Sequence, residues 1–476
     1  MKKPVIIWMR QDLRLSDHPA FELATTLGKK VIPCYVLDSR SERKWAPGSA
    51  SRWWLHHSLM ELDQRLSEIG GRLILKSGDS VEILSALARQ TDASAVYWLN
   101  AVEPDARKDE LRLRIALEKH GIEGQGFGGY LLFEPGTIKN LGGSPFRVFT
   151  PFWKKCLQNM DQRRLASGTA PLEIHHPLPD SDLLANWGLL PIKPDWSKGL
   201  RKSWQPGEQY GQALLANLMN RITHYDTERN FPDKNATSHL SPYLHFGNIS
   251  IAQAFEASGL AEQHSNKSTL SFQRELGWRE FSAHLLFHFT ELPEKPFRTN
   301  FLAFPWREDP VALRAWQTGK TGFPLIDAGM RQLWHTGWMH NRVRMVAASF
   351  LVKHLLIPWQ QGQAWFWDTL VDADLANNAA GWQWIAGCGA DAAPYFRIFN
   401  PVLQGQKFDP HGTYVKRWVP ELTKLPDRYL HTPWIAPTDV LQRAGITLGS
   451  NYPTPLINLA EGRKRALAAF NQFNQR

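Results

Sequence analysis

Short apolar runs alternate with amphipathic stretches along the first quarter of the chain. The apolar runs are VIIWM, VIPCYVL, RLILK and AVYWL, at residues 5–9, 31–37, 72–76 and 95–99. The longest amphipathic stretch, SRWWLHHSLMELDQRLSEIG at residues 51–70, ends in a glycine that is typical of a helix C-cap. Strands that alternate with helices predict a parallel, doubly wound, Rossmann-like α/β domain over residues 1–130. No GxGxxG or P-loop string follows the first run, so the usual dinucleotide or triphosphate site is not predicted there.

The pattern changes after this domain. Residues 131–206 are irregular and rich in proline, which is typical of a connection that runs over the protein surface. From residue 207 onward the helical period dominates and few β-like alternations remain. We therefore expect an all-α domain over residues 207–476, joined to the α/β domain by a linker over residues 131–206.

Composition narrows the class of protein. With 476 residues, 43% of them hydrophobic and 21% charged, the chain is typical of a globular protein with more than one domain. The formal net charge of +10 favours a polyanionic partner such as nucleic acid, or an anionic membrane surface. The three cysteines are scattered, which excludes a disulfide framework or a four-cysteine metal site and fits a reducing cytoplasm. No apolar run is long enough to span a membrane, so we expect a cytoplasmic monomer with no membrane contact and no metal site.

The stretch 359–399 mixes tryptophans, aspartates, asparagines and glycines in a way that suits neither a core helix nor a surface helix. Asn378 and Trp382 are four residues apart and share one face of a predicted helix. Asp372 and Asp374 come just before that helix, where a ring N–H, a ribose hydroxyl or a loop backbone can use an ionised acceptor. The stretch therefore predicts a binding site for a large planar redox cofactor. An aromatic core segment with solvated acidic caps is the alternative.

Residues 234–242, KNATSHLSP, form a second stretch with candidate chemistry. It gathers hydroxyl, amide and backbone donors into a short span before a proline. Such a span can hold phosphates, as donors at helix starts and in turns commonly do. An ordinary N-cap loop is the alternative.

A third stretch, RELGWREFSAHLLFHF, has a polar helical face. Glu275, Trp278, Arg279 and Ser282 share that face because they are three or four residues apart. A carboxyl group beside a tryptophan wall can hydrogen-bond a heterocycle that packs against the ring. The alternative is a salt bridge between Arg279 and Glu275.

A fourth stretch, TGWMHNRVRM, is predicted to be one helical face as well. Trp338, Asn341, Arg342 and Met345 follow the i, i+3, i+4, i+7 spacing of a helix. This mixture of side chains makes a poor core and suits the mouth of a binding cavity, where Arg342 can bind a phosphate. An exposed basic face is the alternative.

These stretches and several others resemble the photolyase and cryptochrome flavoproteins. The shared motifs run almost from end to end and include WMRQDLRLSDHPAF, ATSHLSP, ELGWREF, KTGFPLIDAGMRQLWHTGWMHNRVRM, WDTLVDADLANNAAGWQW and YFRIFNPVLQGQKFDPHGTYVKRWVPEL. Within the family the chain is most similar to the bacterial photolyases that repair cyclobutane pyrimidine dimers in DNA. The resemblance implies that the helical domain binds FAD at the base of a cavity, and that a dimer flipped out of damaged DNA enters this cavity. It also implies a light-driven reaction, in which one electron passes from excited reduced FAD to the dimer and then returns.

The resemblance assigns residues to the cofactor by motif. Asn378 would face the flavin N5, where an amide can satisfy the reduced ring. The residues that would border the isoalloxazine are Asp372, Asp374 and Arg344. Those that would hold the phosphates and the ribitol are Tyr225, Thr237, Ser238, Leu240 and Ser241. The expected set is completed by His239, which stands where many relatives have an arginine, and by Phe272, Arg279, Trp338 and Ala373.

The resemblance also implies a lesion pocket, a DNA contact surface and an electron path. Glu275 would hydrogen-bond the dimer, with Trp278 and Trp384 as apolar walls. The pocket would be completed by Asn341, Arg342 and Met345, and the DNA strand would meet Arg229, Ser282, Gln404 and Lys407. The tryptophans of the hopping chain that re-reduces the flavin would be Trp382, Trp359 and Trp306, with core packing as their alternative.

The resemblance leaves two choices open, the antenna and the branch of the family. A light-harvesting antenna is expected in the first domain, either methenyltetrahydrofolate or an 8-hydroxy-deazaflavin. Ala106 stands where folate-binding relatives have a glutamate, although Glu103 is near, and Trp53 and Trp54 suit either a stacked antenna or the core. A cryptochrome signalling role and a (6-4) photolyase are the alternative functions. The glutamate and tryptophan of ELGWREF favour repair over signalling, and the Asn-Arg pair of TGWMHNR disfavours the (6-4) branch.

Overall fold

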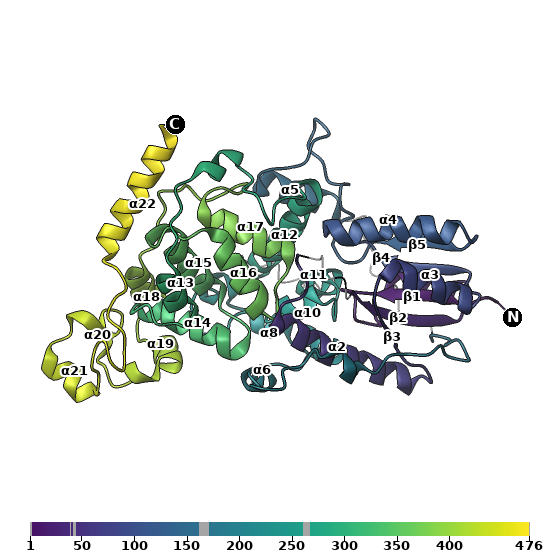
Figure 1. The fold of residues 1–476 in the computed structure, drawn as a ribbon, viewed down its shortest axis with the longest axis horizontal. Helices are drawn as coiled ribbons and strands as arrows, with labels where there is room; N and C mark the ends of the chain where they lie inside the picture. The colour runs from purple at the N-terminus through teal and green to yellow at the C-terminus, as the bar shows by residue number, and fades with distance from the viewer. Residues whose placement is uncertain (1, 39, 41–43, 161–170, 260–266, 476) are drawn as a thin grey trace.

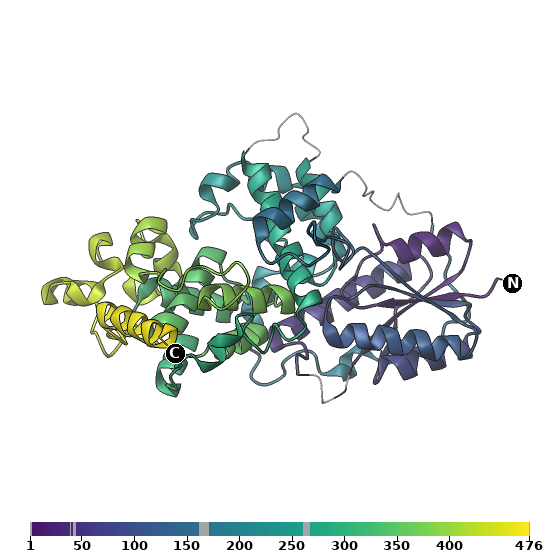
Figure 2. The same ribbon diagram turned by 90° about the horizontal axis from the view of Figure 1, so that it is seen from above.

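The structure, a computed structural model, describes residues 2–38, 40, 44–160, 171–259 and 267–475. The predicted linker therefore falls partly outside the described residues. An α/β part at the N-terminal end joins a helical part that makes up the rest of the molecule (Figure 1). The N-terminus lies at the outer end of the α/β part, and the C-terminal helix lies at the opposite end of the molecule (Figures 1 and 2).

The α/β part is a five-stranded sheet with helices on both faces. Its strands are β1 (Val5–Met9), β2 (Val31–Leu37), β3 (Ile74–Ser77), β4 (Ala95–Leu99) and β5 (Glu123–Phe127). All strand pairs are parallel, and the strand order is β3-β2-β1-β4-β5. The helices that follow the first four strands are α1 (Pro19–Thr26), α2 (Ser49–Glu68), α3 (Ser80–Gln90) and α4 (Pro104–Glu118). The predicted doubly wound parallel sheet is confirmed, and its first four strands lie on the four apolar runs.

Strand β5 was not predicted. Its sequence, EGQGF, is exposed or only partly buried along its whole length, whereas β1 and β4 are fully buried. An edge strand needs no apolar run on both faces, so the hydrophobic pattern gives no signal for it.

The remainder of the chain is helical. The elements of the predicted linker are α5 (Phe149–Gln158), η2 (Leu184–Trp187) and α6 (Lys198–Ser203). The helices up to the candidate site are α7 (Glu208–Ala216), α8 (Leu218–Ile222), α9 (Tyr225–Glu228), α10 (Ser241–His245), α11 (Ile251–Gly259), α12 (Lys267–His288), η4 (Thr299–Ala303), α13 (Pro310–Gln317), α14 (Pro324–Thr336), α15 (Asn341–Ser349), η5 (Phe350–His354), α16 (Trp359–Thr369) and α17 (Leu375–Ala386). The last helices are α18 (Pro401–Phe408), α19 (Thr413–Trp418), η6 (Pro420–Leu422), α20 (Asp427–Leu430), η7 (Pro433–Ile435), α21 (Thr438–Ala444) and α22 (Leu459–Asn474). The helical second part is confirmed, and none of the helices in the described residues is long and apolar enough to cross a membrane.

The expectation of a surface connection over residues 131–206 is wrong for helix α5. Phe149, Phe152, Trp153 and Cys156 are buried, and α5 packs against α12. These four apolar positions are three or four residues apart, which is a helical spacing that the surrounding prolines obscured. This helix belongs to the same hydrophobic core as α12.

Buried polar groups fasten the segment after β1 to the helical part. Asn248 accepts a hydrogen bond from Trp54 Nε1 at 3.0 Å and donates one to the Leu13 carbonyl at 3.2 Å. The carboxylate of Glu208, which is 1% exposed, accepts a hydrogen bond from the Leu15 amide at 2.6 Å. Because a buried polar group without a partner is costly, these bonds hold the carboxyl edge of the sheet against the helices.

Trp53 and Trp54 are core residues. Both rings are at most 1% exposed. The Trp54 ring packs against Tyr243 at 4.9 Å and Trp204 at 5.5 Å between ring centroids. A stacked antenna needs an accessible ring face, so the core alternative is confirmed for these two residues.

Candidate functional site

The acidic turn before α17 joins three of the predicted stretches. Asp374 caps α17, because its Oδ1 accepts hydrogen bonds from the amide and the side chain of Asn377, both at 2.8 Å. Asp372 Oδ2 accepts hydrogen bonds from Ser241 Oγ at 2.7 Å and from Arg344 Nη2 at 2.9 Å. The turn therefore brings together the start of α10, α15 and α17. The predicted helix after the two aspartates is confirmed.

Unpaired polar atoms mark the inner part of this site. Asp372 Oδ1 is buried, and it has no hydrogen-bond partner among the described residues. The side-chain amide of Gln363, on α16, is fully buried and also unpaired among those residues. Asn378 is linked to the backbone of the same residue, since Asn378 Nδ2 donates to the Gln363 main-chain carbonyl at 3.0 Å. Buried polar atoms are nearly always paired in proteins, so these atoms have spare capacity for a polar ligand.

Gln363 was missed by the sequence reasoning. Its signal was a glutamine in the stretch WQQGQAW that lies four residues after Trp359, on the apolar side of an amphipathic helix. A fully buried glutamine on such a face needs partners, which makes it a candidate for a ligand contact.

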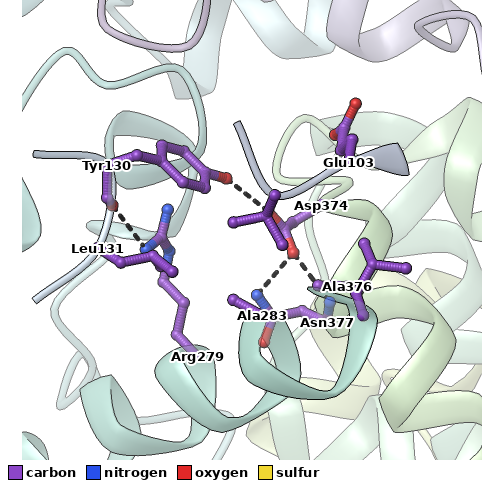
Figure 3. A pocket seen from close by; sticks show the side chains of 10 residues that line it. Glu103, Tyr130, Leu131, Arg279, Ala283, Asp374, Ala376 and Asn377 are labelled. Atoms are coloured by element: carbon purple, nitrogen blue, oxygen red, sulfur yellow. Dashed lines mark hydrogen bonds between the residues drawn. The ribbon is translucent and has the colours of Figure 1, made fainter. Parts of the chain in front are cut away.

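A pocket lies beside the site, where the carboxyl edge of the sheet meets the helices (Figure 3). Its polar lining consists of Glu103, Tyr130, Arg279, Asp374 and Asn377. The Tyr130 hydroxyl donates to Asp374 Oδ2 at 2.9 Å, and Arg279 donates to the Tyr130 carbonyl at 3.2 Å. The pocket thus couples two groups of the helical part to residues that follow the sheet.

The two carboxyl groups of the pocket have opposite pKa shifts. Burial raises the pKa of Glu103, and the nearby negative charge of Asp374 raises it further. Burial acts in the same direction on Asp374, but His245, 3.6 Å away, Arg279 and the Asn377 amide together more than offset it and hold the pKa of Asp374 below its usual range. The two opposite shifts make Asp374 the more acidic of the two carboxyl groups.

The predicted phosphate cradle lies directly before α10, a short helix that begins at Ser241. His239 has a positive φ of 58°, and its ring centroid is 4.9 Å from that of Trp338. Burial, together with the smaller effect of the Arg221 charge, lowers the pKa of His239 to about 4. Arg221 donates to the Thr237 carbonyl at 3.4 Å, whereas Ser238 Oγ accepts from the Leu240 amide. The imidazole of His239 is therefore neutral, at the position where the resemblance implies an arginine in many relatives.

The other predicted cofactor residues surround this loop and the turn. Tyr225 is buried, with its ring edge toward Phe272 at 5.7 Å. Leu240 and Ala373 are buried as well. Arg279 donates to backbone carbonyls, including Leu244 at 3.2 Å, and the predicted alternative of a salt bridge from Arg279 to Glu275 is wrong.

The predicted single helical face over residues 336–345 is wrong. Gly337 has a positive φ of 66° and ends α14, and His340 caps the start of α15 by accepting a hydrogen bond from the Arg342 amide. Trp338 therefore lies in the turn between two helices. Among the residues predicted for that face, the members that share α15 are Asn341, Arg342 and Met345.

The face expected to meet a lesion contains a charged pair. Glu275 Oε1 accepts a hydrogen bond from Arg229 Nη1 at 2.6 Å, and both side chains are partly exposed. Trp278, one turn after Glu275, is partly buried. Ser282, in contrast, is buried, and its hydroxyl donates to the Trp278 carbonyl at 2.9 Å. Ser282 therefore presents little surface to a DNA strand.

Trp278 and Trp384 stand on two different hydrophobic cores. Trp278 packs on the core that α12 shares with the α/β part, whereas Trp384 packs on the core of α14 to α17. Helices α12 and α17 pack against each other, so the two predicted walls belong to adjacent helices. Met345 also packs against the second core.

The predicted DNA contacts beyond this face gather on α15 and α18. Arg342 Nη2 donates to Asn230 Oδ1 at 2.6 Å, and its guanidinium lies 4.6 Å from the Phe408 ring centroid. Lys407 lies 5.2 Å from the same centroid and is exposed. Gln404 is on the same helix as Lys407, and α18 packs against α14 and α15. Two positive charges therefore flank one aromatic ring at the rim of the site.

The three tryptophans of the predicted hopping chain belong to one hydrophobic core. Trp382 and Trp359 are at most 3% exposed, and Trp306 is partly buried at the edge of that core. Gly362 allows α16 to approach the Trp382 ring, because a Cβ atom there would stand 2.1 Å from the ring. The order from buried to partly exposed agrees with both a hopping chain and plain core packing.

The fold and the site together define a protein with an α/β part, a helical part and a buried polar site in the helical part. Residues 5–174 match the family model "DNA photolyase", and residues 272–472 match the model "FAD binding domain of DNA photolyase". The chain is 48% identical to a deoxyribodipyrimidine photo-lyase of Agrobacterium fabrum, with 98% of this chain and 97% of the relative covered. It is 38% identical to cryptochrome-1 of Arabidopsis thaliana, over 99% of this chain and 70% of that protein.

A solved structure of a photolyase also matches this chain. The crystal structure of a bacterial class III photolyase from Agrobacterium tumefaciens superposes with a TM-score of 0.94, at 46% identity, over 100% of this chain and 98% of that one. The chain belongs to the DNA photolyase family. Its helical part carries that family's FAD-binding domain, and the unpaired atoms of Asp372 and Gln363 fit the polar edge of such a ring system.

Proposed function

We propose that this protein repairs cyclobutane pyrimidine dimers in DNA with light as the energy source. The observation that carries the proposal is the partly exposed ion pair between Arg229 and Glu275, a residue that precedes Trp278 by about one turn of α12. A carboxylate next to an indole suits a flipped base, which offers polar edges and apolar faces at once. The 48% identity to a curated deoxyribodipyrimidine photo-lyase over 98% of the chain supports the same reaction.

FAD, when bound and reduced, supplies the excited electron that opens the cyclobutane ring. The residues that we propose for its phosphates and ribitol are Tyr225, Thr237, Ser238, Leu240 and Ser241. Asp372 and Arg344 form an ion pair that can hold the ring edge, and Asp372 keeps one oxygen free for it. Asn378 offers an amide that both donates and accepts, so it can serve the ring in either protonation state.

The protein's own groups bind the lesion and exclude water from it. Trp278 and Trp384 provide apolar surface for the fused bases, and Glu275 provides the hydrogen bond that orients them. Arg229 fixes the carboxylate by its 2.6 Å contact. Asn341 completes the polar rim of the proposed lesion pocket.

The strand on either side of the lesion meets the basic rim. Arg342 and Lys407 can neutralise phosphates, and Gln404 can bind them through its amide. The net charge of +10 supports this polyanionic partner. Because the phosphate contacts carry no sequence information, we expect binding at dimers in any sequence context.

Blue-light signalling is the second candidate function, supported by the 38% identity to a plant cryptochrome over 99% of the chain.

One assay separates the repair function from the signalling function. An oligonucleotide with a defined thymine dimer is incubated with reduced protein in blue light and in darkness, and intact thymines are measured by chromatography. Light-dependent recovery is the expected result. If the protein holds FAD but no dimer disappears, the repair proposal is wrong. A parallel (6-4) photoproduct substrate should remain unchanged.

A further inference from the structure

The indole of Trp278 is stacked on a ring from outside its own helix. The Trp278 and Phe149 ring centroids are 3.8 Å apart and the ring planes differ by 9°. Phe149 is 2% exposed and is the first residue of α5, which lies beside α12 (Figure 1). Phe281 packs edge-on against both rings, at 5.9 Å from each. One face of the predicted lesion wall is therefore covered by the segment that the sequence had indicated as a linker.

The backbone of Phe149 is hydrogen-bonded to the segment between α17 and α18. Its amide donates to Asp391 Oδ2 at 3.1 Å. Asp391 lies in the segment between α17 and α18, a few residues after Trp384, and has a positive φ of 49°. A non-glycine residue with this backbone conformation needs support from its surroundings, and the bond to Phe149 supplies one contact.

We propose that Phe149 is a positioning residue for the lesion pocket, and that it acts by holding the Trp278 ring in the orientation that packs against a flipped dimer. This inference rests on the proposed repair function. An indole on a helix surface can adopt several staggered rotamers, and a second ring stacked flat on one face removes all but those that keep the planes parallel. In the proposed function, the opposite face of Trp278 is then left to pack against the dimer. Pre-organisation of this kind lowers the entropy lost when the substrate binds.

The size of the effect follows from the geometry. Stacked aromatic pairs contribute a factor of about 2 to 10 beyond the area that they bury. Removal of the Phe149 ring with preservation of most of its volume should therefore weaken binding of the dimer by about that factor. Binding of undamaged DNA does not use the pocket, so it should not change.

The test uses the FAD-loaded protein and three variants. Phe149→Leu removes the ring, and Phe149→Tyr keeps it. Phe152→Leu is the matched control, since Phe152 is on the same helix, is equally buried and contacts Phe281 and His284 instead of Trp278. Affinities for a dimer-containing and an undamaged oligonucleotide are measured in darkness. We expect Phe149→Leu to lose about 2- to 10-fold in dimer affinity alone, and the other two variants to match the parent.

A second readout reports the stack without DNA. Protein labelled with 5-fluorotryptophan gives a fluorine resonance for Trp278, assigned with a Trp278→Phe variant, and loss of the Phe149 ring should move it more than Phe152→Leu does. A moved resonance with unchanged dimer affinity overturns the positioning role, and so does an equal loss of affinity in Phe149→Leu and Phe152→Leu. If the parent itself shows no preference for the dimer, the repair function is wrong, and the resonances distinguish that failure because they are recorded in the absence of DNA.

Discussion

Glu275 and Arg229 form an ion pair of 2.6 Å that joins α12 to the end of α9. Both side chains are partly exposed, with 29% and 21% of their surface accessible. A pair at such a position contributes little to stability, because solvent screens it. In the proposed function, the pair matters because it fixes the direction of the carboxylate that would meet one edge of a base.

Replacement of Glu275 by alanine should therefore slow repair more than it weakens binding. Hydrogen bonds to charged groups contribute about 1.5 to 3 kcal/mol, so we expect the repair yield per absorbed photon to fall about tenfold or more. The released Arg229 can still attract phosphates, and dimer affinity should change less than the yield does. The repair yield of Glu275→Gln, which keeps hydrogen-bonding atoms, should lie between the yields of the parent and of Glu275→Ala. An unchanged yield in Glu275→Ala would remove this residue from the mechanism.

Arg342→Ala should weaken DNA binding and flatten its salt dependence. Its guanidinium is held at the rim by Asn230 and by the Phe408 ring. Loss of one phosphate contact lowers the slope of log affinity against log salt by about 0.9. The loss should be equal for damaged and undamaged strands, as measured by titration at several salt concentrations. Arg443→Ala, an exposed arginine on α21, is the control and should leave the slope unchanged.

The sequence was most informative where chemistry and periodicity coincide. The four apolar runs gave β1 to β4 because strands buried on both faces are continuously apolar. Asp374 was placed just before a helix, and it is the residue that caps α17. The pairing of Asp372 with Ser241 joins positions 131 residues apart, and no local pattern contains such information.

The sequence analysis missed three features. Each depends on tertiary contacts, or had a correct local signal that another signal outweighed. Helix α5 has a helical apolar spacing, but the prolines around it suggested a surface connection. Trp338 fitted a helical stripe by spacing, although the glycine before it already had the means to end α14 at a positive φ. Glu275 found its partner in Arg229 because α9 packs beside α12, which the one-helix argument for Arg279 did not consider.

Gln363→Leu should reduce the retention of FAD. The side-chain amide is fully buried without a partner among the described residues, so a ligand that pairs with it gains about 1 to 3 kcal/mol over one that faces leucine. We expect a roughly tenfold or larger rise in the FAD dissociation constant, measured by fluorescence of the flavin released on dialysis. Gln360→Leu is the control on the same helix, since Gln360 is exposed. Equal retention in both variants would show that Gln363 pairs with nothing in the bound state.

Asp409 should make stability depend on pH in mildly acidic solution. Burial raises the pKa of Asp409 to about 6, although its carboxylate accepts hydrogen bonds from the Tyr414 and Val415 amides. The pKa of an aspartate in the unfolded chain is about 3.9. Between these two pKa values the folded chain binds more protons than the unfolded chain. The free energy of unfolding therefore falls as pH rises from about 4 to 6.

The fall attributable to this group should be about 2 to 3 kcal/mol. Asp409→Asn cannot ionise and should lose this part of the pH dependence, so the variant becomes more stable relative to the parent as pH rises. Urea unfolding of the FAD-loaded protein at a series of pH values measures the difference. Asp439→Asn, at an exposed position on α21, controls for the loss of one charge. If the difference between Asp409→Asn and the parent stays constant from pH 4 to pH 7, the buried carboxyl is not the titrating group.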